Sequence, residues 1–150
     1  MPGAWNNKRA RGALTQRCGK ISEAAVRIGM DDSGLRRALG SDNPRAETAD
    51  WIAQAAGVSL DYLCGRTDNP GRGTPARKFE NFYTRLDWIL RARGRNLISL
   101  AGYLNIPPWQ MQQLHRTGVI PAINRACRMA EFLDVSLDWL MGCTENRNVL

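Results

Sequence analysis

The chain has 150 residues, of which 43% are apolar, and it carries a formal net charge of +7. Two units of about 70 residues could each bury a core, although each would be marginally stable alone. No apolar run is long enough to span a bilayer, and the opening MPGAWNNKRARG lacks the apolar stretch of a secretory signal. We therefore expect a cytoplasmic protein with no membrane partner.

The sequence has few residues of the kinds that form metal-binding or catalytic sites. The four cysteines, Cys18, Cys64, Cys127 and Cys143, form no CxxC or CxxH spacing, and His115 is the single histidine. Zinc binding is therefore not expected. The sequence also lacks a glycine-rich phosphate loop and a paired-carboxylate motif, which argues against an enzyme, a cofactor and a small-molecule ligand.

The chain begins with a basic stretch, NNKRARGALTQRCGK. Its two glycines and weak apolar periodicity predict a first helix that is short or frayed. Residues 1–12 are therefore expected to form an arm. Its Lys8, Arg9 and Arg11 either contact phosphates or a minor groove, or serve only solubility. Trp5 is expected to be disordered.

Four further helices are predicted in the first half, residues 1–65. Their segments are EAAVRI, capped by Ser22, DSGLRRAL, capped by Asp31, RAETADWIAQAAG after Pro44, and a short last helix capped by Ser59. The following residues 66–78, RTDNPGRGTPARK, predict a linker. Its Arg72, Arg77 and Lys78 either contact phosphates or lie on a solvated connector.

Five helices are predicted in the second half, residues 79–150. The first has one apolar face, formed by Phe79, Phe82, Leu86, Ile89 and Leu90. Asn96 caps the second, Pro108 begins the third, and Ser136 caps the last. The fourth buries Ile123, Ala126, Met129, Ala130 and Leu133. Trp51, Trp88 and Trp139 are expected to pack in the two cores. The fold class is therefore all-α.

The ending of the first half is repeated 77 residues later. VSLDYLCGRTDN, residues 58–69, and VSLDWLMGCTEN, residues 135–146, are identical at eight of twelve positions. Each half also carries a helix-turn-helix pattern: a small residue, a permissive turn residue and an apolar anchor at spacings of four and six. These are Ala25, Gly29 and Leu35 in one half, and Ala101, Asn105 and Met111 in the other.

The second half resembles the Cro/C1-type (Xre) helix-turn-helix family of phage and bacterial regulators. The resemblance rests on LAGYLNI, Met111, Pro121 and MAEFLDVSLDWLMG, and the first half matches more loosely from about Ala13 to Gly65. It implies two tandem five-helix, lambda-repressor-like helix-turn-helix domains joined by a short linker. It further implies a regulator in the bacterial cytosol, associated with the nucleoid, with no catalysis.

The resemblance places base contacts on the third helix of each half. In the first half the implied residues are Asp32, Ser33, Arg36 and Arg37, although Asp32 is better explained by the helix dipole. In the second half they are Pro108, Trp109, Gln110, Gln112, Gln113 and Arg116. Pro108 and Trp109 depart from the family pattern. Trp109 either contacts DNA, anchors a protein partner or packs on its own unit.

We therefore predict that the protein is a transcriptional regulator that binds double-stranded DNA sequence-specifically, with repression favoured over activation. The alternative is a protein-binding module on the same scaffold: an RNA polymerase-binding activator or a phage-encoded inhibitor of host defence. In that case one half would bind DNA, and the other a protein or a second copy of the chain. The modest charge of each half slightly favours this alternative.

Overall fold

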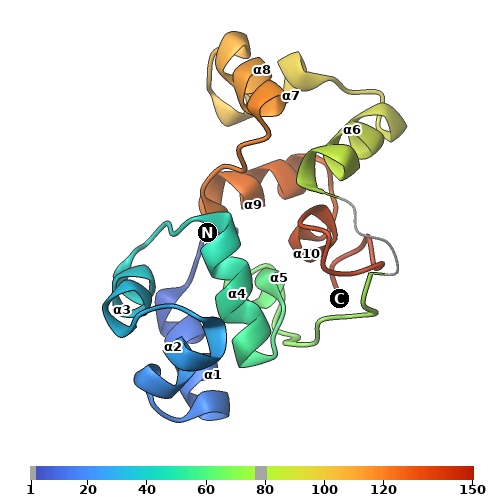
Figure 1. Ribbon diagram of the computed structural model, residues 1–150. Helices are drawn as coiled ribbons and strands as arrows, with labels where there is room; N and C mark the ends of the chain where they lie inside the picture. Colours follow the sequence, from blue (N-terminus) through green and yellow to red (C-terminus); the bar gives the residue numbers. More distant parts are fainter. Residues whose placement is uncertain (1–2, 77–80) are drawn as a thin grey trace.

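The computed structural model describes residues 3–76 and 81–150 (Figure 1). The first half holds α1 (Asn7–Cys18), α2 (Ile21–Ile28), α3 (Asp32–Gly40), α4 (Ala46–Ala56) and α5 (Leu60–Leu63). The second half holds α6 (Phe82–Ala92), α7 (Leu97–Leu104), α8 (Pro108–Thr117), α9 (Ile123–Phe132) and α10 (Leu137–Leu140). Within these described ranges no strand forms beyond two isolated bridges, so the all-α prediction is confirmed. Phe79 lies outside them, as do Arg77 and Lys78.

The helix signals of the second half act as predicted. Asn96 and Ser99 form a capping box at the start of α7, and Asn105 ends that helix in the left-handed conformation at φ 58°. Pro108 is the first residue of α8. The predicted apolar face of α9 is buried along its whole length, from Ile123 to Leu133. Local sequence therefore determines both the ends and the orientation of these helices.

The start of the chain differs from the prediction. α1 is a regular helix of 12 residues, capped by Asn6 and buried through Ala10 and Leu14. Trp5 is only 6% exposed, and its backbone N–H donates to Asn124 Oδ1 at 2.7 Å. The frayed helix and the disordered Trp5 were therefore wrong predictions. This segment is ordered by contacts with residues far away in the sequence, and such contacts cannot be predicted from local apolar periodicity.

Residues 66–76 are packed against both halves. The Arg66 guanidinium pairs with the Asp61 carboxylate at 2.8 Å, and both side chains are nearly inaccessible. The carbonyl of Pro70 accepts the Ser59 N–H, and the carbonyl of Thr74 accepts the Glu145 N–H. Over residues 66–76 the predicted linker is docked, because its backbone and Arg66 form hydrogen bonds with the two halves.

The two halves touch along α4 and α9 and along α5 and α10. At the first contact, Arg45 and Ala122 form an antiparallel bridge, and the Ile123 N–H donates to the Pro44 carbonyl at 2.9 Å. Asn124 extends this contact through hydrogen bonds to Asn43 and Asp42. Figure 1 shows α1–α3 on one side of this junction and α6–α8 on the other.

The tryptophans are less uniformly buried than expected. Trp139 is 8% exposed, as predicted, but Trp51 and Trp88 are 49% and 51% exposed. Trp51 points away from the face of α4 that buries Ile52 and Ala53. Trp88 packs against Trp139, with ring centroids 5.9 Å apart, and the Arg147 guanidinium lies 5.4 Å from the centroid of its ring.

Candidate nucleic-acid interface

The first helix-turn-helix is formed by α2 and α3. Gly29 ends α2 at φ 87°, a conformation that costs a glycine little, and its N–H donates to the Ala25 carbonyl. Ala25 and the anchor Leu35 are both buried, as the predicted triplet requires. α2 begins at Ile21 after Lys20, one residue before the expected cap Ser22.

The second helix-turn-helix, formed by α7 and α8, repeats this geometry. Asn105 takes the left-handed turn position, and the Ile106 N–H donates to the Ala101 carbonyl at 3.1 Å. Ala101 and Met111 are fully buried. The structure thus brings together both triplets that the sequence spacing predicts.

The outward face of α3 carries Ser33, Arg36 and Arg37, all of which are exposed. Arg36 Nε lies 3.1 Å from Asp32 Oδ1, in a pair that is about half exposed on both sides. Such an exposed pair is worth little and can be exchanged for a base or phosphate contact. Asp31 precedes the helix, but its carboxylate accepts the Ser33 hydroxyl at 2.7 Å, and this hydrogen bond lowers its pKa.

The outward face of α8 is uncharged apart from its last turn. Trp109 is 64% exposed, Gln112, Gln113 and Arg116 are exposed, and Gln110 is half-buried. Trp109 therefore lies outside the buried core of its own unit. With Leu114 and Val119, it lines an open groove of about 550 Å³. Val119 is itself 54% exposed.

His115 holds the end of α8 against α6. Its Nε2 lies 2.8 Å from Asp87 Oδ1, and its ring meets Tyr83 edge to face. Asp87 and His115 are 28 residues apart, so no local sequence signal pairs them. The contact orients α8 on its own half.

Of the other basic residues predicted to contact DNA, some are exposed in the structure and others contact the protein itself. Lys8 and Arg11 are exposed on α1. Arg9 instead donates to the Tyr62 carbonyl at 2.8 Å and stacks on the Tyr62 ring, which gives it a structural role. Arg72 is half-buried beside a small cavity between the halves. Arg77 and Lys78 lie outside the described residues.

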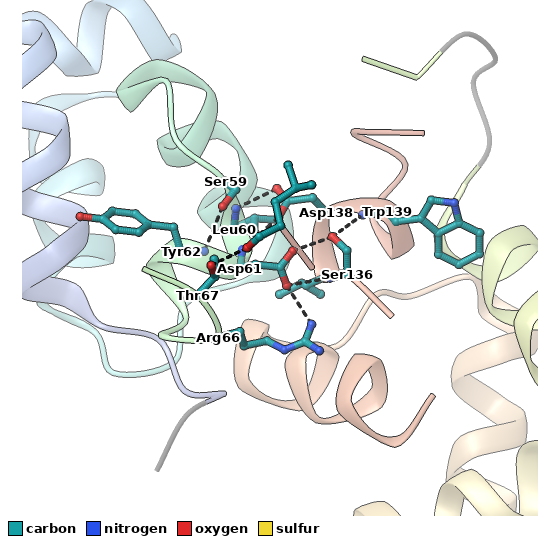
Figure 2. A network of polar contacts seen from close by, with 11 residues as sticks. Ser59, Leu60, Asp61, Tyr62, Arg66, Thr67, Ser136, Asp138 and Trp139 are labelled. Carbon is teal, nitrogen blue, oxygen red and sulfur yellow. Dashed lines mark hydrogen bonds and ion pairs between the residues drawn. The ribbon is translucent and has the colours of Figure 1, made fainter. Parts of the chain in front are cut away.

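A buried polar network joins α5 to α10, and sequence reasoning missed it (Figure 2). Asp61 Oδ1 accepts the Leu137 N–H at 2.9 Å, while its Oδ2 accepts the Ser136 hydroxyl. Asp138 accepts the N–H groups of Leu60 and Asp61 at 2.7 and 3.0 Å. Both aspartates are at most 3% exposed. The repeated SLD motif is their sequence signal, but local sequence predicts only the helix caps Ser59 and Ser136 from it.

Burial and the neighbouring Asp61 raise the pKa of Asp138 to about 8, although the two backbone hydrogen bonds oppose the shift. At neutral pH Asp138 therefore keeps its proton, and the carboxylate of Asp61 is paired with the Arg66 guanidinium. This network positions the two halves and offers no open space for a substrate.

Cys64, Cys127 and Cys143 lie at contacts between the halves, whereas the Cys18 thiol donates to the Ala55 carbonyl within the first half. Cys143 Sγ donates to Asp50 Oδ1 at 3.1 Å, and burial raises its pKa. Contact with Cys127 and burial raise the pKa of Cys64. Raised pKa values make these thiols poor nucleophiles and poor metal ligands.

Comparison with protein families, curated proteins and solved structures found no match for this chain. Within residues 3–76 and 81–150, no group of three or more His, Cys, Asp or Glu side chains is placed to hold a metal ion. Over the same ranges, no helix has the length and apolar character needed to cross a membrane.

Proposed function

We propose that the chain is a sequence-specific, double-stranded DNA-binding transcriptional regulator, built from two tandem five-helix helix-turn-helix units. One observation carries the proposal: the same helix-turn-helix geometry occurs twice, each time with the polar outer face of its second helix exposed. A face of this kind fits the major groove, where base edges display distinct donors and acceptors. The resemblance to Cro/C1-type regulators supports the same function.

The two faces offer different chemistry to DNA. Arg36 and Arg37 on α3 carry guanidinium groups, which pair bidentately with guanine O6 and N7. Gln112 and Gln113 on α8 carry amides, which pair with adenine N6 and N7. Arg116, Lys8 and Arg11 are exposed cations suited to phosphates. We favour repression, because occupying a promoter is sufficient for it, whereas activation requires a further protein contact.

Selection of duplexes from a random library by the full chain at near-physiological salt tests this proposal. The expected result is a reproducible motif whose binding survives competition by unrelated duplex. The proposal would be overturned if no motif were enriched and if the chain bound all duplexes alike, with an affinity that falls away as salt rises.

A second candidate is a protein-binding module, favoured by the exposed apolar groove of α8 around Trp109 and Val119. Exposed tryptophan is enriched among residues that dominate protein interfaces. RNA polymerase and a second copy of the chain are the partners to test, by sedimentation of mixtures with and without the selected duplex. Binding to a protein in the absence of any DNA preference would favour this candidate.

A further inference from the structure

Equivalent residues of the two halves meet each other at the junction. Pro44, Arg45, Ser59 and Asp61 correspond to Pro121, Ala122, Ser136 and Asp138 at the constant offset of 77 seen in the repeated sequence. The antiparallel bridge joins Arg45 to Ala122, so it joins a residue to its own equivalent. A contact of this kind lies on a two-fold axis, because translation along a common direction would pair non-equivalent residues.

The aspartate network obeys the same rule. Asp61 accepts the Leu137 N–H, and its equivalent Asp138 accepts the N–H of Leu60, which is the equivalent of Leu137. Each contact is thus repeated with the roles of the halves exchanged, as in an isologous dimer interface. The contacts at the junction are therefore related by a pseudo-two-fold rotation within one chain. Figure 2 shows the network of these aspartates.

This arrangement is fixed by buried contacts. Ser59, Asp61, Ser136 and Asp138 are each at most 4% exposed, and the segment 66–76 is docked beside them. The hydrogen bonds of Asp61 and Asp138 to backbone N–H groups of the opposite half are shielded from water, where such bonds are stronger, so they hold the halves together. The two candidate reading helices are therefore presented in one geometry, not on a flexible tether.

The two-fold axis determines how α3 and α8 face a ligand. A rotation by half a turn leaves position along its axis unchanged, so α3 and α8 lie at the same level along that axis. Five residues lead from Gly40 at the end of α3 to Arg45, and five from Thr117 at the end of α8 to Ala122. Each segment spans at most about 18 Å. Because Arg45 and Ala122 are bridged, the C-terminal ends of α3 and α8 lie at most roughly 40 Å apart. This bound is compatible with half-sites one DNA turn apart, about 34–36 Å, and is shorter than two turns.

We infer that a single chain binds one duplex site composed of two unlike half-sites in inverted orientation at one fixed spacing. This inference rests on the proposed DNA-binding function. Inversion follows from the pseudo-two-fold axis, because B-DNA has local two-fold axes perpendicular to its own. The half-sites differ because α3 presents arginines and α8 presents Trp109 and glutamines. No second copy of the chain is needed to complete the site.

The test uses the full chain and the motif found by duplex selection. Four duplexes are compared: the selected site, the site with one half reversed, and sites with about 5 or about 10 base pairs inserted between the halves. Reversal or either insertion should lower affinity by roughly 100-fold, to that of a single half-site, because the second contact is lost. Equal affinity for the inverted and reversed sites would overturn the inference while leaving DNA binding intact. Failure to select any motif would overturn the proposed function, and the inference with it.

Stoichiometry provides the second readout. Sedimentation of the complex should show one chain on the selected duplex. The control variant Arg91→Ala changes an exposed residue of α6, and it should bind the duplex with the same affinity and stoichiometry as the parent chain. Two chains on a duplex of two like half-sites would overturn the inference.

Discussion

Asp61 and Asp138 each hold the start of the helix that carries the other. Asp61 accepts the N–H of Leu137, and Asp138 accepts the N–H of Leu60. The first N–H groups of a helix have no partner within it, and a carboxyl oxygen of an aspartate can accept their hydrogen bonds. α5 and α10 have four residues each and would not persist alone. Each aspartate therefore stabilises the short helix of the other half, and the same hydrogen bonds join the two halves.

Asp61→Asn should be strongly destabilising. The change removes the carboxylate from Arg66, whose side chain is 9% exposed, and leaves a buried cation without its partner. Breaking such a pair costs about 3–5 kcal/mol. Urea unfolding of the full chain at pH 7 measures this loss.

Asp138→Asn is the matched control on the other half. At neutral pH this position already holds a proton, so a neutral amide replaces a mostly neutral carboxyl. The loss of unfolding free energy should therefore be much smaller than for Asp61→Asn. Equal losses in the two variants would contradict the assignment of the proton to Asp138.

Stability should depend on pH through Asp138. Its pKa is raised in the folded chain from 3.8 to about 8, so the folded state binds the proton more tightly than the unfolded state. The resulting stabilisation is fully present below about pH 4 and is lost as pH rises through 8. Thermal unfolding of the parent chain should show this decline, and Asp138→Asn should flatten it. Parallel pH curves for the two proteins would exclude Asp138 as the cause.

Replacing Arg36 and Arg37 with Ala should weaken binding to the selected duplex by about 1–3 kcal/mol per lost base contact. Folding should be unaffected, because both side chains are exposed and the Arg36–Asp32 pair is solvent-screened. Electrophoretic titration against selected and unrelated duplexes separates base from phosphate contacts. Unchanged affinity would remove α3 from the reading surface.

Trp109→Ala should leave the melting temperature nearly unchanged, since the side chain is 64% exposed. It should impair binding to DNA or to a protein partner. Gln110→Ala, at the half-buried neighbouring position, is the comparison within the same turn. A fall of several degrees in melting temperature for Trp109→Ala would instead make Trp109 part of the α8 packing.

Local sequence was sufficient to predict most helices and both helix-turn-helix triplets. Periodicity along α9, caps such as Asn96 and Ser136, and the left-handed turn at Asn105 all act within a few residues. The candidate reading residues of α3 and α8 were implied by the resemblance to Cro/C1-type regulators, and helical spacing accounts only for their sharing one face. Trp5 and α1 could not, since their order depends on contacts such as the one with Asn124.

The repeat in the sequence by itself determined that two similar helical halves exist, because identical caps and apolar spacings produce identical local structure. Only the tertiary structure decided how the halves are related. The hydrogen bond of Glu145 to Thr74, the bridge of Arg45 to Ala122 and the exchange between Asp61 and Asp138 all join residues about 70 or more positions apart. A two-fold relation and a translation would leave the same repeat in the sequence, and only the contacts across the junction distinguish them.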